Sequence, residues 1–323
     1  MKITKPLFLA IGLLLFQCGQ AQDWKTIEVT DHCTARHENS VVALGEKVIL
    51  LGGRGIKPTE VFDTHTREWT KQAPTPIEIN HFQAVTFRGE IYVLGAFTGG
   101  FPHEQPIEHI YIFNVEKNEW RKGPDLPKDR LRGAAGCVVY QDKIYLVGGI
   151  QDGHWDGAVS WLDEYDPIEN SWRTLADAPH ARDHVSVGVI DGRLYVAGAR
   201  RSSGITNQYL ELTESAVDVY DFVTDTWQTL PEDQNIPTER AGCSAVVMGQ
   251  KLLILGGESA SQVGAHAEVE AYNTVEMKWE ALPNMVQGRH GTGAVNIDGK
   301  IFTAAGCGQR GGTPELNTIE VLE

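Results

Sequence analysis

The chain has 323 residues, with 28 basic and 43 acidic side chains, so its formal net charge is −15. This balance argues against nucleic acid or an anionic membrane surface as a partner, because both are bound through a basic footprint. Hydrophobic residues make up 41% of the chain, which is typical of a globular protein with a sizeable core.

The first 21 residues have the pattern of an export signal. Two lysines precede the apolar run 7–16, and a small-x-small site ends at Ala21, the order found in cleavable signal peptides. We expect cleavage after Ala21, which places one domain, residues 22–323, in the periplasm or outside the cell. Cys18 leaves an alternative, a lipoprotein anchored through that cysteine. No later stretch is long and apolar enough for a membrane span.

Three short features then recur in the same order. A pair of small residues is followed by an aromatic residue with Asp or Asn, and a tryptophan comes six residues after that Asp or Asn. Successive pairs lie about 43–58 residues apart, a period that indicates propeller blades. The pairs are Gly52-Gly53, Gly95-Ala96, Gly148-Gly149, Gly198-Ala199, Gly256-Gly257 and Ala305-Gly306, and the tryptophans are Trp69, Trp120, Trp172, Trp227 and Trp279.

This pattern resembles the kelch repeat, over about residues 24–323. The resemblance implies an all-β, six-bladed propeller whose blades each hold four antiparallel strands, named a to d from the central channel outward. Some secreted six-bladed kelch proteins are sialic-acid epimerases, and the chain is similar to them in export signal, repeat and size. Because kelch propellers host very different activities, the resemblance implies architecture far more than chemistry.

The last repeat is incomplete, and the N-terminus holds what it lacks. The chain stops at Glu323 after strand c of the sixth blade, without a tryptophan for strand d, whereas Trp24 has no blade before it. We expect the segment 23–26 to be the missing strand d and to close the ring. Closure removes the free edges that an open sheet would expose.

The alternation of strand direction places the d–a and b–c loops on one face. Cys33 lies in the d–a loop after the closing strand, and Cys307 follows strand b of the same blade. We therefore predict a Cys33–Cys307 disulfide, which an exported protein permits. Cys137 and Cys243 fall in strand a of blades three and five and are expected to be buried free thiols.

In five of the six blades, strand a begins with a repeated arginine. Guanidinium groups suit carboxylates and sulfates, so these arginines are candidate ligand-binding residues at the channel mouth. The alternative is structural, in which each arginine hydrogen-bonds to carbonyl groups of neighbouring blades. The position holds Arg36, Ile79, Arg132, Arg182, Arg240 and Arg289, and the next two positions add polar candidates that break the repeat, His37, Glu38, Asn80, His81, Asp183, His184 and His290.

The kelch resemblance also implies pocket residues in the b–c loops, just after the small pair. Three of these loops are long, residues 97–109, 150–161 and 200–214, and we expect them to wall the same face. Carried over to this sequence, the pocket positions are Arg54, Phe97, Gln151, Asp152, Arg200, Arg201, Glu258, Gln309 and Arg310, and the long loops add His103, His154, Trp155 and Tyr209.

The first functional hypothesis is a site for an anionic carbohydrate, a uronate, sialate or sulfated glycan, held by arginine with aromatic stacking. A lyase or epimerase extends it, because a carboxylate held by arginine makes the adjacent carbon more acidic. His81 or His184 would then remove that proton, with Tyr209 as partner. The second hypothesis is a non-catalytic scaffold, since kelch propellers commonly bind acidic peptide segments on this face.

Two further chemistries are weaker in the sequence. Glu258, Gln262 and His266 have a spacing similar to the iron motif of plant kelch specifier proteins, but the middle carboxylate is missing. We therefore expect no metal and no cofactor. A glycosidase pair among Glu38, Asp183 and Glu258 stays open, because the separation of the carboxylates decides that chemistry.

Overall fold

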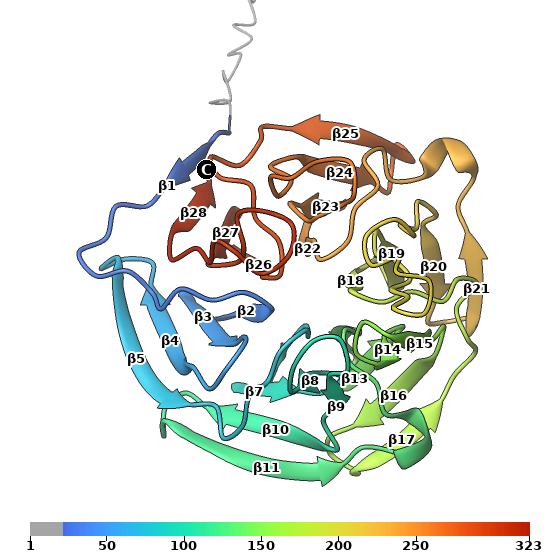
Figure 1. The fold of residues 1–323 in the computed structure, drawn as a ribbon, viewed down its shortest axis with the longest axis horizontal. Coiled ribbons are helices and arrows are strands. Elements are labelled where there is room, and N and C mark those ends of the chain that lie inside the picture. The colour runs from blue at the N-terminus through green and yellow to red at the C-terminus, as the bar shows by residue number, and fades with distance from the viewer. Residues whose placement is uncertain (1–21) are drawn as a thin grey trace, which may run out of the picture.

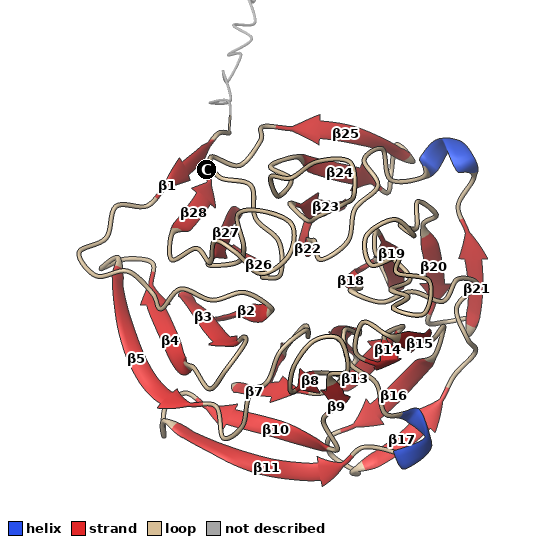
Figure 2. Cartoon of the chain, viewed as in Figure 1, coloured by secondary structure: helices blue, strands red, loops and turns tan. Residues whose placement is uncertain are grey.

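The structure, a computed structural model, describes residues 22–323 as six four-stranded antiparallel sheets arranged in a ring (Figure 1). Helix within this range is limited to two short 3₁₀ turns, η1 (Lys128–Arg130) and η2 (Glu232–Gln234) (Figure 2). The all-β six-bladed propeller predicted from the repeats is confirmed. The predicted signal peptide and Cys18 lie outside the described residues. Within them, no helix has the length and apolar character needed to cross a bilayer.

Each blade except the last is formed by four strands in chain order, and small hairpins interrupt the numbering in the b–c loops of blades two and three. Blade one holds β2 (Asn39–Leu44), β3 (Lys47–Gly52), β4 (Pro58–Asp63) and β5 (Glu68–Pro74), and blade two holds β6 (Val85–Phe87), β7 (Glu90–Val93), β10 (His109–Asn114) and β11 (Glu119–Asp125). Blade three holds β12 (Gly136–Tyr140), β13 (Lys143–Val147), β16 (Leu162–Asp166) and β17 (Ser171–Thr174), and blade four holds β18 (Ser186–Ile190), β19 (Arg193–Ala197), β20 (Asp218–Asp221) and β21 (Thr226–Thr229).

Blade five holds β22 (Ser244–Met248), β23 (Lys251–Leu255), β24 (Val269–Asn273) and β25 (Lys278–Leu282), and blade six holds β26 (Ala294–Ile297), β27 (Lys300–Ala304), β28 (Ile319–Leu322) and β1 (Trp24–Thr26). Two b–c loops add small hairpins, β8 (Phe97–Thr98) with β9 (Gln105–Pro106), and β14 (Ile150–Asp152) with β15 (Asp156–Ala158).

Burial follows the position of a strand within its blade. Strand b of blade one, β3, is buried at every residue after Lys47, because neighbouring blades cover both of its faces. Strand d of the same blade, β5, has no fully buried residue, since it forms the outer rim. This difference explains why the b strands read as continuous apolar runs in the sequence, whereas the d strands are polar apart from their tryptophan.

The repeated tryptophan packs across the sheet on the repeated aromatic residue. In blade three, Trp172 lies opposite Tyr165 in register, and the ring centroids are 4.8 Å apart. The equivalent pairs of the other four complete blades have centroid distances of 4.9–5.5 Å. The tryptophans are thus packing residues of the blades.

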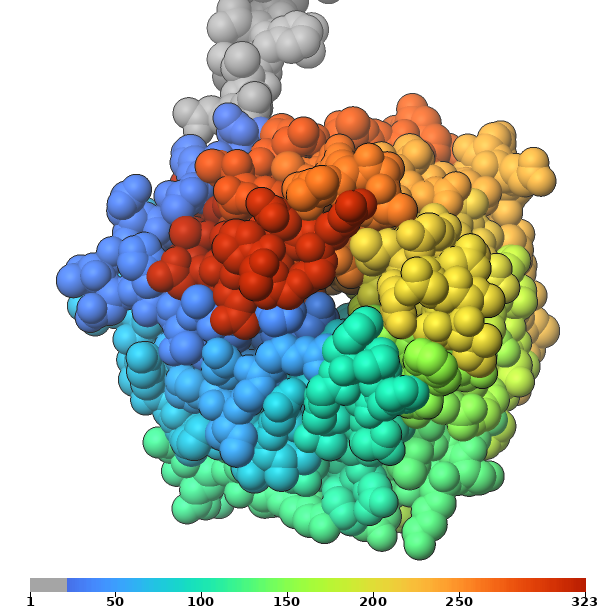
Figure 3. Space-filling view, in the orientation of Figure 1, coloured from blue at the N-terminus to red at the C-terminus, as the bar shows by residue number. Residues whose placement is uncertain are grey.

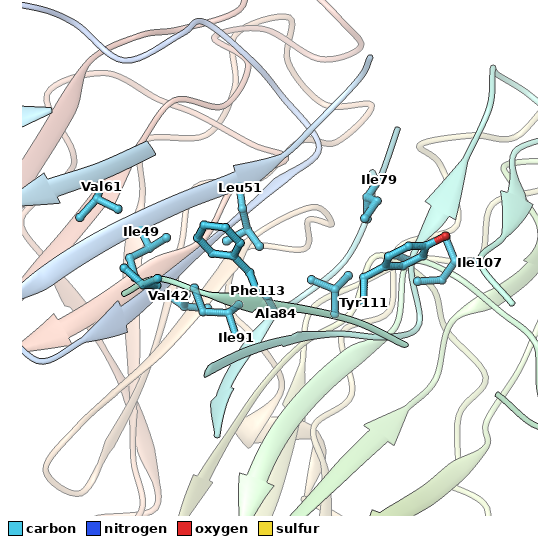
Figure 4. Packing of buried hydrophobic residues seen from close by; sticks show 13 residues of the cluster. Val42, Ile49, Leu51, Val61, Ile79, Ala84, Ile91, Ile107, Tyr111 and Phe113 are labelled. Carbon is cyan, nitrogen blue, oxygen red and sulfur yellow. The ribbon is translucent and has the colours of Figure 1, made fainter. Parts of the chain in front are cut away.

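Adjacent blades share apolar clusters that join them into one ring. The cluster between blades one and two brings strand b residues such as Ile49 and Leu51 against Ile91 and Phe113 of the next blade (Figure 4). Each of the other five interfaces has a comparable cluster. The rigidity of the channel mouth therefore comes from packing around the whole ring.

The ring closes as predicted. Strand β1 pairs antiparallel with β28, with Trp24 opposite Leu322 and Thr26 opposite Glu320. The two strands lie side by side next to the C-terminus (Figure 1). Trp24 is buried and packs in the cluster between blades five and six. The N-terminal strand thus supplies the tryptophan-bearing strand d that the sixth repeat lacks.

The predicted Cys33–Cys307 disulfide is wrong. Both cysteines are free thiols, as are Cys137 and Cys243. Cys33 packs in the cluster between blades six and one, and its thiol donates a hydrogen bond to the Asn317 carbonyl group at 3.2 Å. Shared position on one face did not bring the two sulfur atoms together, because the Cys33 side chain enters the core. The prediction of buried free thiols at Cys137 and Cys243 is confirmed, although Cys243 lies one residue before its strand.

Candidate functional site

A cavity of about 550 Å³ opens at the centre of the face that carries the d–a and b–c loops. A space-filling view shows a narrow opening there, bordered by chain segments coloured teal, yellow and red (Figure 3). The lining comes from both loop types, as the strand alternation predicted. The residues are His37, Glu38, Arg54, His81, Gly100, Phe101, His154, Arg200, Tyr209, Leu210, Glu258, His290, Gly311 and Gly312.

The five repeated arginines do not line this cavity. Each is 0–2% exposed and bonds within its own blade, to the carbonyl group of the first residue of the small pair and to a carboxylate on strand c. They therefore act as ties inside blades, and the alternative role as ties between neighbouring blades is wrong. The pairs are Arg36–Glu60, Arg132–Asp163, Arg182–Asp218, Arg240–Glu270 and Arg289–Glu320.

Blade two replaces both members of the tie. Ile79 stands at the arginine position, and Tyr111 stands at the position of the strand c carboxylate. Both belong to the apolar cluster between blades one and two (Figure 4). The two substitutions occur together because a buried carboxylate without its arginine would be an uncompensated charge. The tie is thus a structural unit that an apolar pair can replace.

Two positions after the arginine, the backbone of every blade is left-handed. A side chain in this conformation costs about 1–2 kcal/mol, which glycine avoids. Three blades have glycine or alanine there, whereas the others carry Glu38 and His81, which line the cavity, and His184, which is buried behind it. The φ angles are 55° at Glu38, 51° at His81, 51° at Ala134, 54° at His184, 63° at Gly242 and 60° at Gly291. Such retained strain points to a functional role for the three polar side chains.

His184 lies in a buried chain of polar groups. Its Nδ1 bonds the Asp183 carboxylate, and its Nε2 lies 3.1 Å from Nη2 of Arg200. Burial and the Arg200 charge lower the pKa of His184, so the ring is neutral and Nε2 accepts a hydrogen bond from Arg200. Nη1 of Arg200 donates to Glu258 at 2.6 Å. The chain therefore fixes the tautomer of His184 and the orientation of Arg200.

His290 is a buried cation beside two carboxylates. Burial opposes protonation of the ring, but the attraction of Glu258 dominates, helped by Glu38, and raises the pKa of His290 to about 9. Its Nε2 lies 2.8 Å from the Gln309 carbonyl oxygen and 3.5 Å from Glu258. Its Nδ1 lies 3.9 Å from Glu38 and has no hydrogen-bond partner among residues 22–323. A buried cation flanked by Glu38 and Glu258 is thus part of the cavity lining.

Aromatic side chains form the outer wall. Phe101 is 58% exposed, and the centroid of its ring lies 5.2 Å from those of His154 and Tyr209. Arg54 closes the same side, where it donates to the Gly99 carbonyl group at 2.9 Å and to the Glu104 carboxylate. The wall therefore combines an exposed apolar surface with a cation that its neighbours already orient.

The remaining candidates lie around this centre rather than in it. Asn80 and Asp183 are buried behind the histidines that follow them. Gln151 is exposed, and Asp152 pairs with His103 at the surface. Arg310 is also exposed and donates to the Ala260 carbonyl group. Of the predicted set, the structure brings together His37, Glu38, Arg54, His81, Arg200, Tyr209, Glu258 and His290 in the cavity lining.

The spaced residues Glu258, Gln262 and His266 do not converge on one point. Glu258 pairs with Arg200, whereas the His266 ring lies between Ser259 at 2.8 Å and Glu268 at 3.1 Å. The Gln262 amide group donates to the Gly264 carbonyl group at the surface. Each of the three side chains thus has a different partner.

Comparison with protein families identifies the repeat. Residues 83–306, more than half of the chain, match the KLHDC2/KLHL20/DRC7 Kelch-repeats domain. The chain belongs to the kelch-repeat family. Kelch-like protein terF of Aspergillus terreus is 26% identical over 294 residues, which cover 84% of this chain and 61% of that protein. Kelch-like protein 38 of Rattus norvegicus is 26% identical over 264 residues, covering 80% of this chain and 42% of that protein.

The solved structure of YjhT has the same architecture as this kelch propeller. The two agree with a TM-score of 0.74 at 15% sequence identity, and the match covers 90% of this chain and 95% of the YjhT chain. At this identity the likeness shows the fold alone. The chain also spans less than two thirds of the two curated relatives described above.

Several residues of this kelch propeller's site were missed or placed only loosely from the sequence. His154 was predicted only as a wall residue, and Phe101 and Glu104 were not singled out. The strand c carboxylates were also missed, although a signal existed. An acidic residue stands three positions before the repeated Asp or Asn in the four complete blades that carry the arginine, and Tyr111 stands there in blade two.

Proposed function

We propose that this kelch propeller binds a small acidic carbohydrate in the cavity at its channel mouth. The observation that carries the proposal is the gathering of three cations, His290, Arg54 and Arg200, in the lining of one cavity. The Nδ1 of His290, 3.9 Å from Glu38, also lacks a hydrogen-bond partner among the described residues, which is rare for a buried polar group. The volume of about 550 Å³ also lies in the range of small-molecule sites.

Charge and shape favour an acidic sugar. The imidazolium of His290 and the guanidinium groups of Arg54 and Arg200 provide cations oriented by their neighbours, a preorganisation that reduces the cost of binding. Glu38 and Glu258 accept hydrogen bonds from hydroxyl groups. Phe101 and Tyr209 offer an apolar wall on which a sugar ring packs.

The proposal extends to proton transfer. His81 lines the cavity and lies 3.3 Å from the Glu38 carboxylate, whereas the neutral His184, oriented by Asp183, is buried behind it with its Nε2 facing Arg200. Burial chiefly lowers the pKa of His81, with the neighbouring His154 adding to the effect. Neutral imidazoles of this kind are general bases for a proton next to a carboxylate. Lyase or epimerase activity on the bound acidic sugar is the reaction class that this arrangement supports.

The binding test is a thermal-shift and calorimetric screen of residues 22–323 with uronates, sialic acids, sulfated oligosaccharides and neutral sugars. We expect an acidic sugar to bind. Phe101→Ala should weaken binding at least tenfold, because the Phe101 ring forms the wall on which the sugar packs. The fold should be unaffected, because Phe101 is exposed at the rim. The matched control is Arg310→Ala, which removes an arginine outside the cavity and leaves binding unchanged. Equal binding of neutral sugars would refute the acidic specificity, and no binding of any sugar would refute the proposal.

Turnover is tested separately. Proton NMR of the bound sugar in deuterated buffer would show exchange of the proton next to the carboxylate, and we expect His81→Gln to slow this exchange, because His81 lines the cavity. Binding without exchange or product formation would limit the function to recognition.

A second candidate is an interaction scaffold that binds an acidic peptide. Large apolar residues are exposed in the b–c loops of four blades, Ile56, Phe101, Ile205 and Val263, each at 58–62%. Exposed apolar residues around a polar mouth are typical of protein docking. A glutamate-rich peptide that binds the propeller and loses affinity in Phe101→Ala, with no sugar binding, would support this role.

Export remains part of the proposal, based on the pattern of residues 1–21. Mass spectrometry of the mature protein is expected to show Gln22 at the N-terminus. A lipid-modified Cys18 at the N-terminus would support the lipoprotein alternative instead.

A further inference from the structure

Three histidines from consecutive blades converge between the mouth cavity and the channel. His81 comes from the start of blade two, His154 from the b–c loop of blade three, and His184 from the start of blade four. Their ring centroids are 4.9–5.1 Å apart, and one nitrogen of each ring lies within 4.8 Å of the nitrogens of the others. We propose that these three histidines bind one divalent first-row transition-metal ion, with zinc as the reference ion. The inference goes beyond the sugar site and does not depend on sugar binding. It replaces the general-base role of His81 and His184, because a lone pair that binds a metal cannot accept a proton.

The outer nitrogen of each ring already has an oxygen partner. Nδ1 of His81 lies 2.7 Å from Oδ1 of Asn80, Nδ1 of His154 lies 3.1 Å from Oε2 of Glu104, and Nδ1 of His184 bonds the Asp183 carboxylate. Ligand histidines are typically held in this way, because a hydrogen bond at one nitrogen fixes the tautomer and presents the other nitrogen to the metal. Each Nε2 is therefore the candidate ligand atom.

The contacts of His81 support a missing cation. With Nδ1–H donated to Asn80, Nε2 of a neutral ring carries a lone pair, yet it faces Oε2 of Glu38 at 3.3 Å. Two acceptors face each other there, and a positive charge between or beside them relieves the repulsion. A bound metal ion satisfies both groups, with His81 as its ligand and Glu38 balancing its charge.

Arg200 occupies the lone pair of His184 in the absence of a metal. Its Nη2 lies 3.1 Å from Nε2 of His184, whereas its Nη1 donates to the Glu258 carboxylate at 2.6 Å and its Nε donates to the Ser202 hydroxyl group at 3.0 Å. Arg200 thus keeps two partners when a metal takes that lone pair. The carboxylates of Glu38, Glu104, Asp183 and Glu258 offset the positive charges of the metal and the arginines.

The backbone around the cluster is specialised for this convergence. His81 and His184 keep left-handed backbones at positions where other blades have glycine or alanine. Gly153, just before His154, lies against the segment that carries Glu104, and a Cβ atom there would meet the Pro102 oxygen and the Glu104 nitrogen at 2.5 Å. The glycine lets the Glu104 carboxylate reach His154. The same three blades therefore hold both the ligands and the groups that orient them.

The geometry fits an open metal site. Zinc binds imidazole at about 2.0–2.1 Å, so the three rings must move inward slightly from their present spacing. Three histidines leave a fourth position, and His81 and His154 also line the cavity of about 550 Å³. Zinc sites with three protein ligands and an open position hold water or substrate there. The fourth ligand would thus come from the cavity.

The first test measures metal binding by residues 22–323 after treatment with EDTA. We expect one equivalent of Zn²⁺ by calorimetry and elemental analysis, and Co²⁺ to give the visible absorption of a low-coordinate nitrogen site. His154→Gln is expected to weaken binding at least 100-fold. His103→Gln is the matched control, because His103 is a surface histidine of the same face, and its affinity should equal that of the wild type.

The second test separates ligands from the groups that orient them. Asp183→Asn keeps the size of the side chain and is expected to weaken Zn²⁺ binding about 10–100-fold, the range seen when such partners are lost. Melting temperatures in EDTA show that each variant is folded. The proposal is overturned if the wild type binds no stoichiometric metal or if His154→Gln binds as tightly as the wild type. Since sugar binding is measured separately, either proposal can fail alone.

Discussion

The tie between Arg240 and Glu270 in blade five offers a direct test of why arginine repeats in this propeller. Blade two shows that Ile and Tyr can replace the pair, at positions 79 and 111. The perturbation is therefore Arg240→Ile and Glu270→Tyr, made singly and together. If the arginines are structural ties, the double variant should be much more stable than the single variants suggest.

The magnitude follows from the contacts that each change removes. Arg240 donates to the carbonyl groups of Thr238, Ile254 and Gly256 and to the Glu270 carboxylate at 2.5 Å. Arg240→Ile leaves Glu270 as a buried charge without its partner, which costs about 3–5 kcal/mol of unfolding free energy. The double variant removes that charge as well, and we expect a coupling energy of about 2–3 kcal/mol, the upper range for contacting residues.

Guanidinium unfolding of the wild type, the two single variants and the double variant gives the double-mutant cycle, provided that the dependence of the unfolding free energy on denaturant is unchanged. Binding of the ligand found in the sugar screen is measured in parallel and should not change in the double variant, because Arg240 lies outside the cavity. Additive losses of stability would refute the role of the pair as one unit. If the double variant were stable but no longer bound the ligand, the repeated arginines would be part of the ligand-binding site.

Three other predictions test the closure of the ring by β1, the raised pKa of buried His290, and the left-handed backbone at the start of each blade. Trp24→Ala should lower the unfolding free energy by about 3–5 kcal/mol, and an unchanged denaturation midpoint would contradict closure by β1. His290 has a pKa raised to about 9, so its contribution is complete below the unfolded value of 6.5 and disappears as pH rises through 9. The stability difference between wild type and His290→Asn should shrink over that interval, and a constant difference would contradict the raised pKa. Gly291→Ala should cost about 1–2 kcal/mol and displace Glu38, because its Cβ would meet the Glu38 carboxylate at 2.8 Å. An unchanged denaturation midpoint of Gly291→Ala would contradict backbone strain at this position.

The export signal and the histidine cluster differ in how far the sequence can predict them. The signal pattern of residues 1–21 is local, so it can be recognised in the sequence without knowledge of the fold. The convergence of His81, His154 and His184 is a property of three blades, and the sequence places these residues 73 and 30 positions apart. Only His81 and His184 share a repeat position, which is why His154 was predicted as part of a wall rather than as a neighbour of both.

The sequence by itself determined the architecture of this protein. The small pair, the aromatic residue and the tryptophan recur at blade spacing, and the last repeat lacks the tryptophan that Trp24 supplies. These signals are strong because every blade packs against its neighbours in the same way and therefore needs similar residues at equivalent positions. The ring and its closure therefore followed from periodicity alone.

The tertiary structure decided which polar residues face the cavity. The sequence placed the repeated arginines at the mouth, but they turn into their blades toward carboxylates on strand c. It placed Cys33 and Cys307 on one face, but Cys33 packs into the core. Side-chain direction and pairing depend on the folded blade and its neighbours, because a buried charge takes the partner that removes its desolvation cost. The strands of one blade bring that partner close, and the adjacent blades bury both groups.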